Sequence, residues 1–412
     1  MSRCFMPAEI LLPNNSVSME KWAVIACDQF TSQSEYWLEV EDIVGDDPSS
    51  LNIVFPEIYL GKDDTRIEKI QNKMKAYLAD GTLDVKIKNG YVLVERDTES
   101  GKRLGVVGQV DLEHYDFNPA NKTMIRATEG TVISRIPPRM KVRMDASIES
   151  PHVMLLIDDD KKHIIESLYE KNSELDKIYD TDLMMNGGHI RGFAVEGAYA
   201  ELLTKAFDEY EEQCGGFMFA VGDGNHSLAT AKSCWEELKK TLSPEEIESH
   251  PARYALVEIV NLHSEALVFE PIHRIMFDTD MDNLLDYFKN ELALDNLSLV
   301  EGNEVVFMQA GNTKGYAIEG RGERLPVDVL QGILDKYLED HKESEIDYIH
   351  GEADLKELVS KTGGCGIFLQ SIDKSTLFPA IKAGGVLPRK TFSIGEANEK
   401  RYYVECRKIT IS

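Results

Sequence analysis

The stretch Phe217-Met218-Phe219-Ala220-Val221-Gly222-Asp223-Gly224-Asn225-His226-Ser227 joins an apolar segment to a polar loop that contains two glycines. The apolar residues before Gly222 are typical of a buried strand. A helix directly after the loop is predicted by the spacing of Leu228, Ala231, Trp235 and Leu238. We expect Ser227 or Asn225 to be its N-cap residue. The sequence therefore predicts a strand, a glycine hinge and a helix N-terminus in succession.

This arrangement is suited to hold a phosphate group, because backbone N–H groups and the helix dipole both point into the loop. Gly222 and Gly224 let the backbone approach a ligand closely, while Asp223 and His226 add acid, base or metal-binding groups. The same residues would also serve a plain tight turn, with Asp223 as a cap and His226 bonded to the backbone. The loop is neither a Walker loop nor the full Gly-x-Gly-x-x-Gly of dinucleotide folds.

Composition restricts the partners that this chain can bind. It has 412 residues and a formal net charge of −27, which argues against nucleic acid and against an anionic membrane surface. The amino terminus does not resemble a signal peptide and no apolar run reaches membrane-spanning length, so we expect a cytoplasmic protein. The length predicts two or three domains. The oligomeric state cannot be inferred from these features.

Metal and cofactor expectations follow from the ligand types that are present. The six cysteines are scattered and the histidines show no HExxH spacing, so we expect no zinc, and also no haem or flavin. Mg²⁺ is the expected cofactor, held mainly by the phosphates of a donor substrate, with Asp223 as the protein ligand.

Alternating strand and helix patterns predict an α/β fold of mixed α+β character. The expected strands span residues 22–26, 91–96, 103–110, 153–157, 255–262, 304–308, 314–318 and 402–409, and the expected helices span 66–78, 161–175, 201–212, 280–292 and 326–339. We expect a core over residues 1–279 that holds the active site, and a C-terminal α/β portion over residues 280–412.

Further candidate residues lie outside the loop. Arg126, Glu129 and Thr131 lie in the segment 125–131, and Arg143 belongs to the concentrated basic stretch that comes next, which is suited to bind phosphate because a carboxylate and two threonine hydroxyls lie beside it. A solvated basic face is the alternative. The remaining candidates are Asp28 after the first strand, His189 among glycines, the pair His273 and Arg274, and a C-terminal basic loop with Lys390 and Thr391 that is expected to close over the site.

Four of these motifs together resemble a bacterial and archaeal family called domain of unknown function 1015. They are the Asp-Gly-x-His loop at residues 223–226, Thr-Glu-x-Thr at 128–131, Pro-x-His-Arg at 271–274 and Pro-x-Lys-Thr at 388–391. The loop also resembles the phosphate loop of the ParB/sulfiredoxin-like fold, which includes the free serine kinases. Their loop reads Asp-Gly-His-His-Arg, whereas this chain has Asn225 and Ser227 at the first His and the Arg.

The resemblance implies a phosphotransferase that acts on a small hydroxyl metabolite. Free L-serine is the implied acceptor, O-phosphoserine the phosphorylated metabolite, and a nucleotide or pyrophosphate the donor. Glu129 is the implied catalytic glutamate, with Asp28, Asp223 and His226 as further catalytic candidates. Two alternatives remain open: a non-catalytic regulatory protein that binds a nucleotide or phosphometabolite, and a phosphoserine phosphatase.

Overall fold

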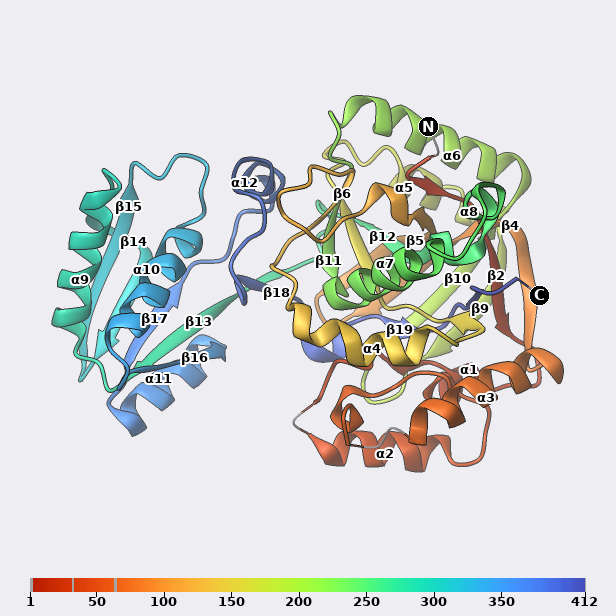
Figure 1. The fold of residues 1–412 in the computed structure, drawn as a ribbon, viewed down its shortest axis with the longest axis horizontal. Helices are drawn as coiled ribbons and strands as arrows, with labels where there is room; N and C mark the ends of the chain where they lie inside the picture. Colours follow the sequence, from red (N-terminus) through yellow and green to blue (C-terminus); the bar gives the residue numbers. More distant parts are fainter. Residues whose placement is uncertain (1–2, 32, 63–64, 412) are drawn as a thin grey trace. The chain divides into compact units, whose positions relative to one another are not determined.

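The computed structural model describes residues 3–31, 33–62 and 65–411, and its contacts divide the chain into two units. The first unit runs up to Val268 and resumes at Gly395, and the second is Phe269–Ile394 (Figure 1). The boundary expected from the sequence lies between residues 279 and 280. The observed boundary lies earlier, because the first strand of the second unit begins at Phe269. In addition, the last residues of the chain, from Gly395 on, belong to the first unit.

The first unit is built on a long hairpin of two strands, β4 (Leu83–Thr98) and β5 (Gly101–Asp111). They belong to a sheet of ten described strands in the order β6-β11-β8-β12-β5-β4-β10-β9, with β1 on β5 and β2 on β4. The others are β1 (Phe5–Met6), β2 (Ala8–Pro13), β6 (Ile125–Ala127), β8 (Met154–Ile157), β9 (Asp176–Asp182), β10 (His189–Val195), β11 (Phe219–Asp223) and β12 (Tyr254–Asn261). Two pairs, β6 with β11 and β8 with β12, are parallel, so the sheet is mixed.

Both faces of this sheet are buried. Along β4 the side chains of Tyr91 and Leu93 pack into one apolar cluster, while Val92 and Val94 pack into another. Such alternation follows from the two-residue period of a strand. The helices of this unit are α1 (Met19–Trp22), α2 (Ser34–Val44), α3 (Thr65–Ala79), α4 (Ile136–Arg143), α5 (Ile165–Tyr169), α6 (Gly197–Gln213), α7 (Asn225–Lys239) and α8 (Pro244–Ser249).

Two small sheets attach the carboxyl terminus to the first unit. Strand β19 (Tyr402–Tyr403) pairs with β3 (Val24–Ile25), and β20 (Arg407–Lys408) pairs with β7 (Ile148–Glu149). The prediction of one strand over residues 402–409 is therefore wrong, because the chain changes partner between β19 and β20.

The second unit has its own six-stranded sheet, in the order β15-β14-β17-β13-β16 with β18 on β13. Its strands are β13 (Phe269–Phe277), β14 (Ser298–Gln309), β15 (Asn312–Glu319), β16 (Glu345–His350), β17 (Cys365–Leu369) and β18 (Phe392–Ile394), and its helices are α9 (Met281–Leu294), α10 (Pro326–Asp340), α11 (Glu352–Thr362) and α12 (Leu377–Gly384).

The mixed α/β class is confirmed, and most elements lie within a few residues of their expected bounds. The helix expected over residues 161–175 is wrong, because it is only the five-residue α5 followed by a short 3₁₀ turn. No helix among the described residues is long and apolar enough to cross a membrane.

Candidate functional site

The carboxyl ends of two neighbouring parallel strands define the site. Strand β6 pairs in parallel with β11, so the Thr128–Thr131 segment leaves the sheet beside the Gly222–Gly224 turn. In open α/β sheets, ligands bind beyond the carboxyl ends of the strands. The strand, turn and helix predicted from the sequence are all present here, since α7 begins directly after the turn.

Gly224 is the N-cap of α7, in place of the expected Asn225 or Ser227. Its φ of +80° lies in the left-handed region, and a Cβ added there would lie 3.0 Å from the Cα of Val153. A side chain would therefore be strained both by its backbone conformation and by its neighbour.

Two polar side-chain atoms near this turn are buried without a hydrogen-bond partner among the described residues. They are Oδ1 of Asn225 and the hydroxyl of Thr131. The amide of Asn225 donates to the Thr128 hydroxyl over 3.4 Å, and that hydroxyl donates to the carbonyl of Val221 over 2.7 Å. Buried polar atoms without partners are costly, and a ligand with hydroxyl or ammonium groups would satisfy them.

Four charged or titratable side chains gather at the amino end of α7. Asp28 Oδ2 lies 3.6 Å from Nε2 of His152, and Asp223 Oδ2 lies 3.6 Å from Nζ of Lys400. The Ser227 hydroxyl lies 3.4 Å from the same His152 nitrogen. Two carboxylates thus alternate with two cationic groups beside the first turn of a helix.

Contacts between distant segments produce this cluster. The pairing of β3 with β19 sets Tyr403 opposite Val24, and the N–H of Ala26 donates to the carbonyl of Arg401. The Tyr403 hydroxyl accepts from the N–H of Cys27 and lies 2.8 Å from Nδ1 of His152. The adjoining segments, which carry Asp28 and Lys400, are thereby held on one side of the turn.

The charges of the cluster shift one another's titration. Burial opposes the charged form of His152, but Asp28 and then Asp223 raise its pKa above the ordinary histidine value. Burial would also raise the pKa of Asp28, yet His152, Gln29 and Lys400 bring it well below its usual range. Each member of the pair therefore favours the charged form of the other.

His226 has a different environment. Burial, with Arg139 and Arg135 nearby, lowers the pKa of His226 to about 4, so its ring is neutral near pH 7. Its Nε2 accepts a hydrogen bond from the N–H of Val132 over 3.3 Å. This bond fastens the segment after Glu129 to α7 and occupies the nitrogen that would otherwise act as a base.

The two predicted arginine anchors are bound to other groups of the protein. The Arg126 guanidinium donates to the carbonyls of Thr123 and Gly216, at the amino ends of β6 and β11. Arg143 donates over 2.6 Å to Glu149, a buried carboxylate that Arg407 also contacts. The structure thus brings Glu129 and Thr131 to the turn, whereas Arg126 points to the opposite end of its strand.

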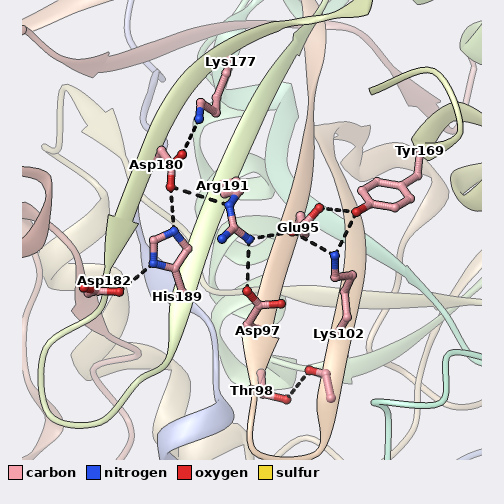
Figure 2. Close-up of polar contacts among 11 residues, drawn as sticks. Glu95, Asp97, Thr98, Lys102, Tyr169, Lys177, Asp180, Asp182, His189 and Arg191 are labelled. Atoms are coloured by element: carbon pink, nitrogen blue, oxygen red, sulfur yellow. Dashed lines mark hydrogen bonds and ion pairs between the residues drawn. The ribbon is translucent and has the colours of Figure 1, made fainter. Parts of the chain in front are cut away.

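His189 lies in a separate network on the sheet (Figure 2). Its ring nitrogens lie 2.6 Å from Asp180 and 2.6 Å from Asp182, and Arg191 contacts Glu95 and Asp97 close by. Burial opposes its charge, but the bonds to Asp182 and Asp180 raise the pKa of His189. The ring is held by these carboxylates.

The remaining predicted residues belong to the second unit. His273 is buried and its Nδ1 accepts from the N–H of Leu369, while the fully buried Arg274 contacts Gln331 and the Arg389 carbonyl. The hydroxyl of Thr391 donates to the Pro388 carbonyl. Lys390 is exposed, with a positive φ of 58°.

Sequence reasoning missed His152, Lys400 and Tyr403. His152 precedes the buried strand β8, whereas Asp28 was found because it follows a strand, and a polar residue before a strand is only a weak signal. Lys400 and Tyr403 were assigned to the C-terminal portion, because nothing in their local pattern shows that the chain returns to the first unit.

A cavity of about 160 Å³ opens beside the cluster. His152, Ser227 and Tyr403 line the side next to the cluster, the charged side chains of Glu57, Arg139, Arg143 and Glu149 also reach the cavity, and apolar side chains form most of the remaining lining. The site thus combines a charged region with an apolar recess.

The carboxylates suit a metal held partly by a substrate. Among the described residues there is no group of three or more His, Cys, Asp or Glu side chains that could hold an ion. Oδ1 of Asp223 accepts from the N–H of Gly224, and its Oδ2 faces Lys400. A Mg²⁺ ion bound here would need most of its ligands from donor phosphates and water.

Comparison with known proteins identifies the family. A family model described as "Protein of unknown function (DUF1015)" matches residues 10–346, so the chain belongs to that family, as its motifs indicated. No curated protein matches the chain.

Solved structures show a weaker likeness. A free serine kinase mutant in complex with ADP aligns with a TM-score of 0.40 and 12% identity, over 73% of this chain and 91% of that one. A conserved hypothetical protein from Pyrococcus furiosus aligns with a TM-score of 0.36 and 12% identity, over 71% of this chain and 92% of that one. C-terminally truncated SbnI from Staphylococcus aureus aligns with a TM-score of 0.37 and 8% identity, over 70% of this chain and 82% of that one.

Proposed function

We propose that this member of the DUF1015 family is a phosphotransferase that acts on a small hydroxyl metabolite, with free L-serine as the first acceptor to test. The observation that carries the proposal is the cluster of Asp28, His152, Asp223 and Lys400 at the N-terminus of α7. Phosphoryl transfer depends mainly on positioning and on stabilising charge, and this cluster supplies both.

In the proposed reaction the backbone after Gly224 holds the donor, a nucleotide or pyrophosphate, through its phosphates. His152 and Lys400 stabilise the negative charge that develops on the transferred group. Mg²⁺ bound through the donor and Asp223 would neutralise further charge.

The acceptor oxygen forms a bond to the transferred phosphorus while the bridging P–O bond of the donor breaks and leaves its electron pair on the donor. The acceptor proton passes to Glu129, which lies on the segment beside the turn. We assign Asp28 the task of keeping His152 charged and oriented, and His226 that of positioning the segment after Glu129.

The test is to incubate the purified chain with L-serine, Mg²⁺ and, separately, ATP, ADP or pyrophosphate, and to measure O-phosphoserine. Glu129→Gln keeps the side-chain size but cannot accept a proton, so the rate should fall ~10²–10⁴-fold with the melting temperature unchanged. A normal rate in Glu129→Gln would remove that residue from the mechanism.

Phosphate release without an acceptor would instead indicate a phosphatase. Donor binding without turnover would indicate a regulatory protein. The latter alternative has its own support, because Asn225 and Ser227 replace the His and Arg of the free serine kinase loop.

A further inference from the structure

The cavity beside the cluster restricts the chemistry of the acceptor. Buried apolar side chains dominate its lining, among them Ile53, Phe55, Met74, Leu228, Ala231 and Leu256. Its volume of about 160 Å³ is close to that of an apolar protein cavity of roughly 150 Å³ that binds benzene. The recess therefore has room for a group of the size of a phenyl ring.

Charged and polar side chains line the cavity as well, but they already have partners, since Arg139 pairs with Glu57 and Arg143 pairs with Glu149. Glu149 accepts from Arg143, from Arg407 and from the N–H of Leu256. The Ser150 hydroxyl donates to the carbonyl of Glu405. A nucleobase in this recess would lose its hydrogen bonds to water without replacing them, which costs free energy. An apolar group has no such cost.

One side of the cavity adjoins the proposed catalytic cluster. His152 and Ser227 line it, and they belong to the cluster assigned to the transferred phosphate. A ligand with an apolar group in the recess would present its hydroxyl to His152 and Ser227 if only one or two carbons separate that hydroxyl from the apolar group.

We propose that the acceptor is a β-hydroxy amino acid or an alcohol that carries an aromatic or branched aliphatic group, and that this group fills the cavity. The inference rests on the proposed function and specifies its substrate class. Free L-serine then binds more weakly than a relative such as 3-phenylserine, because serine leaves the recess to water.

The first experiment measures binding without turnover. Benzyl alcohol, which joins a phenyl ring to a hydroxyl, is titrated into the full chain and followed by ligand-observed NMR. Ala231→Leu fills the recess and should weaken binding by about tenfold or more, a factor worth 1.4 kcal/mol. The matched control is Ala120→Leu at an exposed turn, which should bind as the wild type does.

Circular dichroism checks that each variant is folded, and Ala146→Val tests the same wall of the cavity if Ala231→Leu does not fold. Absent binding of benzyl alcohol to the wild type, or equal binding by Ala231→Leu, would overturn the proposal.

The second experiment compares phosphorylation of 3-phenylserine and L-serine. The expected result is a lower KM for 3-phenylserine, with the preference lost in Ala231→Leu. Equal KM values in the wild type contradict the substrate class. Cavity-dependent binding of benzyl alcohol with no phosphorylated product from either acceptor supports the ligand class and contradicts only the proposed function.

Discussion

His152 connects the charged groups of the site. Its ring is 4% exposed and meets Asp28 and Ser227 on one nitrogen and Tyr403 on the other. An imidazolium in such a position is stable only while the carboxylates around it stay ionised. The charge of His152 thus depends on the carboxylates beside it, Asp28 first and then Asp223.

Because the charge of His152 depends on its carboxylate partners, the stability of the folded chain should vary with pH. The pKa of His152 is raised in the folded chain, so its contribution to stability is fully present below the unfolded value of about 6.5 and is lost as pH rises through the folded pKa. Asp28→Asn removes the first partner and should lower the pKa of His152. Proton NMR of the imidazole measures that shift directly.

The unfolding free energies should agree with the titration. The stability difference between wild type and Asp28→Asn should be larger at pH 6 than at alkaline pH. Asp180→Asn is the matched control, since Asp180 contacts His189 and should move only the latter's pKa. An unchanged His152 titration in Asp28→Asn would show that the ion pair is not the cause.

At the level of elements, the turn between β11 and α7 sets the position of the helix N-terminus. Gly224 has φ +80°, and its missing side chain leaves room for the backbone of Val153. The pairing of β11 with β8 extends to Asp223, which is the partner of Met154, and its register shifts between Val221 and Asp223. Any displacement of this turn moves Asp223 and Ser227 together.

Gly224→Ala should therefore destabilise the chain by about 1–3 kcal/mol, through backbone strain and the close contact. Gly130→Ala is the control, because Gly130 lies on the adjacent segment and an added Cβ there meets nothing within 4 Å. Denaturant unfolding measures both variants. Equal stability of the two would mean that the turn tolerates a side chain.

At the level of the whole molecule, the second unit is an insertion in the first. The N–H of Gly395 donates to the carbonyl of Val268 over 3.0 Å, so the two ends of the first unit are adjacent. Inside the second unit, β13 and β18 begin and end the insertion as paired strands, with Phe269 opposite Ile394.

Replacing residues 269–394 with a short Gly-Ser linker should leave a folded first unit. The reason is that its sheet, its buried clusters and the β3–β19 pair all lie outside the excised segment. A cooperative thermal transition and an unaltered His152 titration are the expected results. Loss of cooperative unfolding would show that the first unit needs the second.

The predicted role of Lys390 is tested in the full chain. If this exposed lysine brings positive charge to a bound phosphate, Lys390→Ala should weaken donor binding and raise the ratio of hydrolysis to transfer, both more strongly at low salt. Lys382→Ala, an exposed lysine in α12, is the control. Unchanged kinetics in Lys390→Ala would remove this residue from the site.

The sequence by itself determined the mixed α/β class, most elements of both units, and the strand, turn and helix around Gly224. Each of these depends on neighbouring residues: the period of apolar side chains, the conformational freedom of glycine and the capping of a helix act over a few positions. The family also followed from short motifs, and the family model confirmed it.

Only the tertiary structure decided which charges meet at the turn. Asp28, His152 and Lys400 come from distant parts of the chain, and they meet because β3 pairs with β19 and β8 pairs with β11. Strand pairing of this kind is set by burial across the whole sheet and leaves no local period. The same reason explains why Arg126 points away from the turn and why the end of the chain belongs to the first unit.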